Sequence, residues 1–337
     1  MASKHRIGID LGGTNIKIGI IDDVGHIHYS NSIPTEADRG LEATFENIIS
    51  LIQETFKSSP VPKNEISGIG IGCPGLIDSV NGIIRDLPNM PGWTNVHLAE
   101  MISKEFNLKV KIDNDVRAAA LGEYKFGAGQ GCSNLICITI GTGIGSGIIL
   151  DGRLIKGSTL CAGEIGHMTL QEHGGPICGC GNTGCLEALG SASAIVRRGH
   201  ELLAGGRPSK IREIKGDGPL TAHIIALAAQ KGDPPAQRIL YETGRWIGIG
   251  LANVINLLNP ELVIIGGGVA SAGDYILGPI RETIRKRTLN YPRDSVRVEA
   301  AQLGESAGII GASLFCSDLM ETPTLGNATH RESSVKI

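Results

Sequence analysis

The sequence has 337 residues, a length that allows two domains and a large buried core. Hydrophobic residues make up 41% of it and charged residues 19%, which excludes an intrinsically disordered chain. A formal net charge of −3 argues against a nucleic-acid-binding surface, and no apolar run is long enough for a transmembrane helix. The N-terminal letters MASKHRIGID predict no signal peptide, and the eight cysteines suit a reducing compartment. We therefore expect a cytoplasmic protein that binds neither membrane nor nucleic acid.

Residues 6–22 predict a strand, a tight turn and a second strand. Isoleucines alternate on both sides of a Gly-Gly turn, which is the pattern of a β-hairpin. That pattern alone fits a plain hairpin, but polar residues gather around the turn. A glycine turn exposes backbone N–H groups that can cradle phosphate, and an aspartate beside it can hold hydrated Mg²⁺. The candidate nucleotide-site residues here are Asp10, Gly12, Gly13, Thr14, Asn15 and Lys17.

An apolar stretch at 66–73 predicts a buried strand that runs into a Gly-Cys-Pro-Gly turn. Gly70, Gly72 and Gly75 formally match the dinucleotide-binding motif. A Pro-Gly pair favours a turn where that motif needs the start of a helix, so we expect no dinucleotide site here.

Two further elements belong to the same part of the chain. Residues 41–57 have the apolar spacing of a helix, and the Pro-rich loop 86–93 is expected to be held in one shape. Asn89 in this loop fits a ligand contact or, more simply, a hydrogen bond within its own turn.

Three polar residues stand where a predicted strand, 108–112, gives way to a predicted helix that begins near Val116. Asp113, Asn114 and Asp115 are all good helix N-caps, and capping is the simplest reading. One residue is enough to cap a helix, however, so a carboxylate is left over. The positive end of the helix dipole would favour its ionised form. Asp115 is therefore the candidate general base.

A second hairpin of the same kind is predicted at 134–152. Shifted by 128 positions, seven of eleven residues match the first hairpin, among them Gly141 and Thr142 opposite Gly13 and Thr14. This similarity predicts an internal duplication with one phosphate-type turn in each half. In the alignment Asp10 falls opposite Ile138, so only the first copy keeps the acid.

The stretch 161–187 has the composition of a metal site. His167 is followed by Cys178, Cys180 and Cys185, and the glycines between the cysteines let the backbone fold around one point. One imidazole and three thiols match the Cys₃His set that binds Zn²⁺ in a closed tetrahedral site. The alternative is three buried cysteines that happen to cluster, since a free cysteine behaves as a small hydrophobe. Glu164 and Glu187 flank the stretch, which suggests that the metal shapes a polar ligand site.

The remainder of the chain reads mainly as helices around one buried strand. We expect helices within 190–237, broken by a Gly/Pro-rich loop at 205–219, and one long helix at 238–258 whose glycines allow close packing. A buried strand then runs into three glycines at 266–268. The last predictions are helices at 276–287 and 303–316 and a frayed polar tail from about 322.

These motifs together resemble the ROK family of sugar kinases, within the actin-like ATPase superfamily, over about residues 6–316. DLGGTN and IGTGIGSG are similar to the two phosphate loops of that superfamily, and GGGV at 266–269 is similar to its adenosine loop. GEIGH followed by CGCGNTGCLE matches the ROK signature. Within the family, GCPG at 72–75 and PNMPGW at 88–93 look most like the glucokinase subgroup, whereas N-acetylmannosamine kinases depart at the GCPG stretch.

The resemblance implies an α/β fold with two actin-like (ribonuclease H-like) domains, a nucleotide and sugar cleft between them and a zinc-binding loop. We expect a smaller domain from 1–116 plus about 302–337 and a larger one from 117–301, assembled as a homodimer or homotetramer. The implied nucleotide site adds Gly141, Thr142, Gly143, Gly266, Gly267 and Gly268. The implied sugar site contains Gly75, Asn89, Asn114, Asp115, Glu164, His167 and Glu187.

The expected activity is transfer of the γ-phosphoryl group of ATP to the 6-hydroxyl of glucose, with Mg²⁺ near Asp10, Zn²⁺ in the Cys₃His set and Asp115 as general base. His167 would use one nitrogen for zinc and offer the other to a sugar hydroxyl. The alternatives are a kinase for N-acetylmannosamine or another hexose, and a catalytically inactive sugar-binding or sugar-sensing protein. A repressor would need a DNA-binding segment before the first strand, and we expect none because that strand begins at residue 6.

Overall fold

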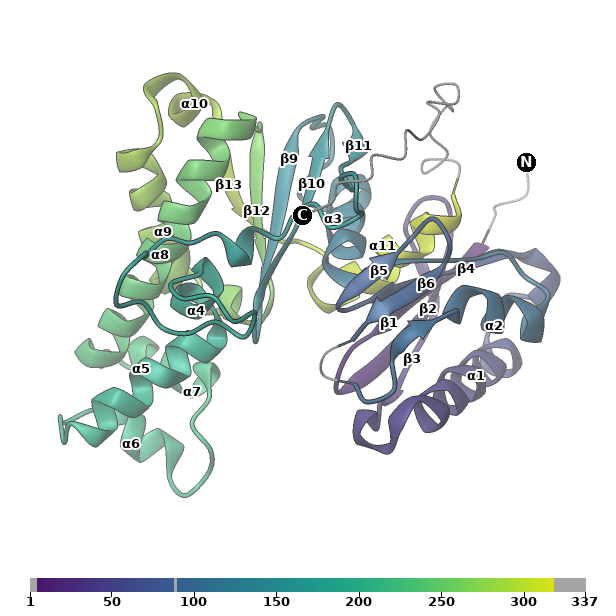
Figure 1. The fold of residues 1–337 in the computed structure, drawn as a ribbon, viewed down its shortest axis with the longest axis horizontal. Coiled ribbons are helices and arrows are strands. Elements are labelled where there is room, and N and C mark those ends of the chain that lie inside the picture. The colour runs from purple at the N-terminus through teal and green to yellow at the C-terminus, as the bar shows by residue number, and fades with distance from the viewer. Residues whose placement is uncertain (1–4, 88–89, 318–337) are drawn as a thin grey trace, which may run out of the picture.

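A computed structural model describes residues 5–87 and 90–317 of the chain. The chain folds into two five-stranded mixed sheets with helices around them, which confirms the predicted α/β class. Figure 1 shows two lobes, one around each sheet. The first sheet has the order β3 (Ile27–Pro34), β2 (Asn15–Ile21), β1 (His5–Leu11), β4 (Ile66–Cys73) and β8 (Val110–Asn114). The second has the order β11 (Arg153–Leu154), β10 (Ile144–Leu150), β9 (Leu135–Ile140), β12 (Leu262–Gly266) and β13 (Arg297–Ala300).

The two sheets repeat one topology. In each, an antiparallel hairpin (β1-β2 or β9-β10) carries a third antiparallel strand on one side and two parallel strands on the other. The likeness therefore extends well beyond the hairpin sequences and supports an internal duplication.

The register corrects one detail of the predicted duplication. Asp10 lies opposite Lys17 in the first hairpin, and Thr139 lies opposite Gly145 in the second. Gly145 follows Lys17 by 128 positions, so Thr139, and not Ile138, occupies the place of Asp10. The shift of one residue arises because the second turn is one residue shorter than the first. The carboxylate is still present in the first copy only.

Each lobe has its own core, and two helices pack between the sheets. Alternation places Ile136 and Ile138 of β9 against the outer helices of the second lobe, while Leu135 and Cys137 face the inner helix α3. Helix α3 contacts strands of both sheets, and α11 contacts α3 and strands of the first sheet. The helices are α1 (Gly40–Ser58), α2 (Leu98–Phe106), α3 (Asp115–Phe126), α4 (Leu186–Gly190), α5 (Ala192–Ala204), α6 (Lys210–Lys215), α7 (Ala222–Gln230), α8 (Pro234–Leu258), α9 (Asp274–Arg287), α10 (Asn290–Ser295) and α11 (Ala307–Ser313).

Glycines in β1 and β4 allow α11 to lie directly on the first sheet. A Cβ atom on Gly8 would collide with the carbonyl of Ile309, and one on Gly70 would collide with the carbonyl of Ala312. The isoleucines on either side of each glycine point to the opposite face, into the core beneath α1 and α2. The returning C-terminal segment thus packs against the N-terminal sheet.

Several elements differ from the sequence predictions. A third sheet of β5 (Leu76–Asp78), β6 (Ile83–Asp86) and β7 (Thr94–Val96) was not expected, because its strands are too short to show a period. Helix α6 interrupts the loop expected at 205–219, and α10 and β13 follow α9 where no element was predicted. The expected helix at 303–316 is a short α-helix flanked by 3₁₀ turns. The frayed tail lies outside the described residues.

Two predictions about packing can be checked. Gly248 of α8 lies where a Cβ atom would come within 2.6 Å of Thr283, so the glycines do allow α8 and α9 to approach closely. In the described part of the chain, no helix is both long and apolar enough to span a bilayer. The domain boundaries at 116/117 and 301/302 stay a proposal.

Candidate functional site

The C-terminal ends of three parallel strands bring the candidate acids together. Asp10 near the end of β1 lies beside Gly72 of β4, and Gly72 lies beside Asp113 of β8. A Cβ atom on Gly72 would stand 3.3 Å from the Cα atom of Asp115, so the absent side chain leaves space at this edge. Ligands of open α/β sheets bind at the carboxyl ends of strands. Asp10 and Asp115, 105 positions apart in the sequence, therefore share one edge.

Asn114 and Asp115 both accept backbone hydrogen bonds at the start of α3, but only Asn114 is the N-cap. Asn114 is the N-cap, and its Oδ1 accepts hydrogen bonds from the backbone N–H groups of Val116 and Arg117 at 3.0 and 3.2 Å. Asp115 accepts a 2.9 Å bond from Val116 through Oδ1. Burial raises the pKa of Asp115, with a further contribution from the negative charge of Glu164. The helix start alone was expected to favour the ionised carboxylate, but burial outweighs it.

The sequence analysis missed a buried charge network beneath Asp115. The Asp113 side chain is only 1% exposed and forms ion pairs with Arg117 Nε at 3.2 Å and Lys156 Nζ at 2.8 Å. Arg117 also donates a hydrogen bond to the carbonyl of Leu160. The network links β8 and α3 to the segment that leads into the zinc-type stretch. Spacing could not reveal it, because Lys156 lies more than forty positions from its partner.

Asp10 lies in a carboxylate-rich environment. Burial, followed by the negative charge of Asp115, raises its pKa from 3.8 to about 6, while Lys17 opposes the shift. A Cβ atom on Gly308 would lie 2.7 Å from Asp10 Oδ2, so this glycine keeps α11 clear of the carboxylate. Lys17 forms a 2.8 Å ion pair with Glu305, just before α11, and does not stand free beside the turn.

Both hairpin turns present backbone to solvent. Gly13, Thr14 and Asn15 are exposed in the first turn, which is closed by a 3.0 Å bond from Gly12 N–H to the carbonyl of Asn15. In the second turn Thr142 is exposed, and Gly141 N–H donates to the carbonyl of Gly143. Both turns can therefore offer N–H donors to an anion.

Gly266, the last residue of β12, and the two glycines after it lie beside the second hairpin. Gly266 pairs with Thr139 of β9, and Gly267 and Gly268 are exposed. Gly267 has φ of 85°, and a Cβ atom there would lie 2.5 Å from the backbone of Ile140. A larger residue cannot occupy this position. Two of the three predicted nucleotide-binding segments are thus neighbours in the second sheet.

His167, Cys178, Cys180 and Cys185 form a cluster, as predicted. Their ligand atoms all lie within 4.8 Å of one another. The Sγ atoms of Cys180 and Cys185 are 3.8 Å apart, and Cys178 Sγ is 3.7 Å from His167 Nδ1. A tetrahedral zinc ion with bonds of about 2.3 Å to sulfur separates two sulfur ligands by about 3.8 Å. The four residues therefore fit zinc.

The protonation of the cluster would be coupled to metal binding. Burial raises the pKa of Cys178 to about 12 and raises that of Cys185, whereas the backbone N–H of Asn182 helps to lower that of Cys180. A zinc ion would therefore have to displace protons from the thiols, and its positive charge would stabilise the thiolates that result.

Three predicted sugar ligands surround this cluster. His167 directs Nδ1 to Cys178, while Nε2 lies 4.0 Å from the exposed carboxylate of Glu164. Glu187 Oε2 accepts a 2.9 Å bond from Ile144 N–H, and its Oε1 lies 3.6 Å from Cys178 Sγ. Glu187 thus connects the cluster to the second hairpin.

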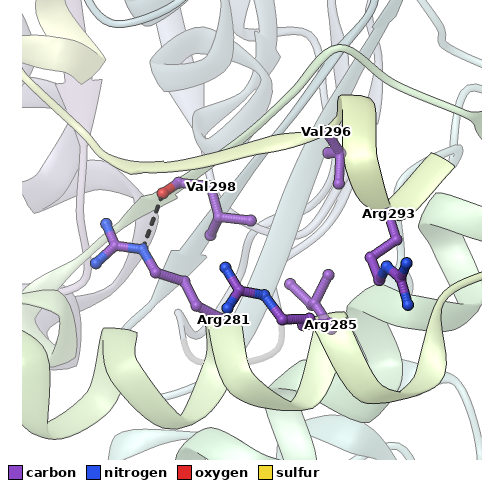
Figure 2. Close-up of a pocket in the computed structure, with 6 residues that line it drawn as sticks. Arg281, Arg285, Arg293, Val296 and Val298 are labelled. Atoms are coloured by element: carbon purple, nitrogen blue, oxygen red, sulfur yellow. Dashed lines mark hydrogen bonds between the residues drawn. The ribbon is translucent and has the colours of Figure 1, made fainter. Parts of the chain in front are cut away.

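The other two predicted sugar residues lie near the first sheet or outside the description. Gly75 follows β4 with φ of 80°, and a side chain there would collide with the carbonyl of Asp86. Asn89 lies outside the described residues. A separate pocket, shown in Figure 2, lies between α9, α10 and β13 and is lined by Arg281, Ile284, Arg285, Arg293, Val296 and Val298. None of these six is a predicted site residue.

Comparison with known proteins extends these observations. The model of the ROK family matches residues 6–318. The chain is 36% identical to a glucokinase of Halalkalibacterium halodurans, over 98% of this chain and 100% of the relative. It also resembles the crystal structure of a ROK family glucokinase from Streptomyces griseus in complex with glucose and AMPPNP, with a TM-score of 0.79, 35% identity and coverage of 92% and 98%.

The family contains proteins of a second kind. The chain is 34% identical to a xylose repressor of Caldicellulosiruptor bescii, over 94% of this chain and 79% of the repressor. Similarity to the shared core therefore does not by itself separate a kinase from a regulator. The family match across nearly the whole chain, together with the duplicated sheets and the Cys₃His cluster, shows that the protein belongs to the ROK family.

Proposed function

We propose that the protein is an ATP-dependent hexose kinase that transfers the γ-phosphoryl group to the 6-hydroxyl of glucose. The observation that carries this proposal is the meeting of Asp10 and Asp115 at one edge of the first sheet. In phosphoryl transfer one carboxylate can hold the metal that binds the phosphates, and a second one can receive the proton of the attacking hydroxyl. A sugar-binding module without chemistry would need neither in this arrangement.

Asp115 is the proposed general base. It would accept the proton of the sugar 6-hydroxyl while that oxygen forms its bond to the γ-phosphorus and the bond to the bridging oxygen breaks, releasing ADP. Burial raises the pKa of Asp115 and so brings its basicity closer to neutral pH, which suits proton transfer. Arg117, held by the buried Asp113, keeps a positive charge nearby and opposes complete protonation.

Backbone groups of the two hairpins would hold the phosphates. The exposed residues 13–15 and 142 offer N–H donors, and Gly267 and Gly268 leave open backbone where a nucleoside can approach. Asp10 would hold Mg²⁺ through water, and the ion would offset phosphate charge. The chain's own contribution is alignment, since Gly308 leaves the Asp10 carboxylate unobstructed.

The zinc cluster would orient the sugar-binding residues. With Nδ1 of His167 bound to the metal, its Nε2 carries the proton and can donate to a sugar hydroxyl on the Glu164 side. A zinc-bound Cys178 is a thiolate and has no proton for Glu187, so Oε1 of Glu187 becomes available as an acceptor. Zinc would therefore prepare three sugar contacts together.

The choice of glucose is supported by similarity to glucokinases over nearly the full chain. N-acetylmannosamine or another hexose is the alternative substrate, and a non-catalytic sugar sensor is the alternative function. A homodimer or homotetramer stays a prediction.

A hexose panel with coupled ADP detection tests the proposal. We expect the highest kcat/KM for D-glucose, and glucose 6-phosphate as the product. A higher kcat/KM for N-acetylmannosamine would change the substrate. If wild type bound a sugar but released no ADP, and Asp115→Asn behaved in the same way, the protein would be a sugar sensor and not a kinase.

A further inference from the structure

A second cluster of metal-ligating side chains lies where β2 turns into β3, with Asp22 and His26 in the turn and His28 in β3. The ligand atoms of Asp22, His26 and His28 all lie within 4.8 Å of one another. His28 Nε2 is 2.9 Å from Asp22 Oδ2, and the rings of His26 and His28 have centroids 4.8 Å apart. None of these residues has a place in the proposed phosphoryl transfer.

The turn fixes the orientation of the carboxylate. Asp22 Oδ1 accepts hydrogen bonds from the backbone N–H groups of Val24 and His26 at 3.0 and 2.9 Å, which leaves Oδ2 directed at the imidazole of His28. Gly25 has φ of 87°, and a Cβ atom there would lie 2.6 Å from the ring of Phe126. The backbone is therefore held against α3, and the ligands are prepared before any ion arrives.

A buried histidine supports this cluster from behind. His5 is 8% exposed, and its ring meets that of His28 edge-on at a centroid distance of 4.9 Å. Its Nδ1 lies 3.6 Å from Glu65, too far for a hydrogen bond. Arg6 next to it is paired with Asp23 at 2.8 Å, so its positive charge is countered. The surroundings thus do not repel a cation.

We propose that Asp22, His26 and His28 bind one divalent first-row transition-metal ion, distinct from the Cys₃His zinc. Two imidazoles and one carboxylate suit zinc, nickel or copper rather than Mg²⁺ or Ca²⁺. Two ligands at right angles on bonds of about 2.1 Å stand about 3 Å apart, which agrees with the 2.9 Å between Asp22 Oδ2 and His28 Nε2. His26 is exposed, so solvent can complete the coordination.

The ion would act on stability and not on catalysis. Arg6 lies opposite Ile21, whereas Asp10 lies opposite Lys17, so the cluster and the candidate site occupy opposite ends of β1. Four residue steps along the strand, from Arg6 to Asp10, separate the two ends by about 13 Å. An ion here would join the end of β2 to the start of β3, and binding to the folded state alone raises the melting temperature.

Nickel binding to the full chain, with zinc already loaded, tests the proposal. Calorimetric titration with Ni²⁺ should show one site in the wild type, and metal analysis afterwards should show that zinc is retained. His26→Ala, which removes an exposed ligand, should weaken Ni²⁺ binding at least tenfold and abolish the Ni²⁺-dependent rise in melting temperature. His97→Ala is the matched control, because His97 is an exposed histidine 3.7 Å from a single carboxylate, Glu100, and it should leave both measurements unchanged.

A second variant distinguishes the loss of a metal ligand from the loss of the fold. His28→Gln keeps an amide that can donate to Asp22 but removes an imidazole, so it should fold, as judged by its melting temperature without metal, and should lose Ni²⁺ affinity. Equal Ni²⁺ binding by wild type and His26→Ala, or heat that is accounted for by displaced zinc, would overturn the proposal. So would the absence of any Ni²⁺ binding by wild type, because the cluster would then be an Asp–His pair that only staples the turn.

Discussion

The carboxylate of Glu187 accepts a 2.9 Å hydrogen bond from the backbone N–H of Ile144, at the start of β10. Its other oxygen lies 3.6 Å from the sulfur of Cys178 in the Cys₃His cluster. One side chain therefore connects a turn proposed to bind phosphate with the metal proposed to shape the sugar site. Glu187 therefore links the proposed ATP site to the proposed glucose site.

Replacement of Glu187 should separate these two roles. Glu187→Gln keeps a carbonyl oxygen for Ile144 but loses the second charged acceptor, so we expect KM for glucose to rise about 10- to 100-fold while KM for ATP changes little. That range corresponds to a charged hydrogen bond of about 1.5–3 kcal/mol. Glu187→Ala also leaves the Ile144 N–H without its partner and should raise both KM values. Equal effects of Gln and Ala on ATP would contradict the division of roles.

Asp115→Asn should lower kcat by about 10²–10⁴, the usual contribution of a positioned general base, while the Kd for glucose changes much less. Asp113→Asn is the contrasting variant. Asp113 is fully buried between Arg117 and Lys156, so its loss leaves two cations without their partner and should mainly reduce the free energy of unfolding, by about 3–5 kcal/mol. Single-turnover kinetics and urea unfolding separate the two effects. A kcat for Asp115→Asn within a few-fold of wild type would place the base elsewhere.

The ordinary pKa of an aspartate would predict activity down to about pH 4. The structure predicts that activity is lost at a higher pH. Burial raises the pKa of Asp10 from 3.8 to about 6 and also raises that of Asp115, and both carboxyls must be ionised to act. The value of kcat/KM should therefore fall as the pH drops through about 6. Raising Mg²⁺ should move only the part due to Asp10 to lower pH, since metal and proton compete for that carboxylate. A flat profile down to pH 4.5 would exclude this account.

The same raised pKa means that ionised Asp10 lowers the free energy of unfolding. Because its pKa is higher in the folded chain, the folded state binds more protons between about pH 4 and 6, and stability falls as the pH rises through that window. At pH 8 without Mg²⁺, Asp10→Asn should raise the free energy of unfolding by up to about 3 kcal/mol, and the gain should vanish below pH 4. Asp23→Asn, which removes the partner of Arg6, should give no such gain. A variant less stable than wild type at pH 8 would show that the Asp10 charge is well solvated.

Sequence patterns predicted the hairpins, the Cys₃His cluster and the position of Asp115, because each depends on residues close together in the chain. Three capping residues stand where one is needed, and this surplus indicated Asp115 as a functional carboxylate. The structure assigns the capping to Asn114. The match of Asp10 with Ile138 was wrong, since a turn one residue shorter leaves no trace in an ungapped alignment.

What the sequence could not show are contacts made across the fold. Lys156 reaches Asp113 over forty-three positions, and Glu187 reaches Ile144 over the same interval. The sequence analysis did not single out the turn at Asp22, because no spacing pattern predicts that His26 and His28 lie beside one carboxylate. Such placements follow from register and helix packing, which propensity does not specify.

Zinc removal gives the most direct test of the cluster's purpose. Cys180 is exposed, whereas Cys178 and Cys185 are buried, so Cys180→Ser removes a ligand with the least disturbance of the core. We expect the variant to lose zinc and to stay largely folded. Its affinity for glucose should fall by two orders of magnitude or more, because His167, Glu164 and Glu187 lose their common support. Zinc sites of this class contribute about 10–16 kcal/mol of apparent binding free energy, enough to hold a loop in one conformation.

The nucleotide should respond differently to the same change. AMPPNP would bind mainly to the glycine turns at 12–15, 141–143 and 266–268, and these rest on strands of both sheets rather than on the zinc loop. Calorimetry should therefore show a modest loss of AMPPNP affinity in Cys180→Ser, through the single Glu187–Ile144 bond, beside the large loss for glucose. Cys161→Ser is the control, since this thiol lies in the same stretch but outside the four-residue cluster. Normal glucose binding by zinc-free Cys180→Ser would make the metal a remote staple with no part in sugar recognition.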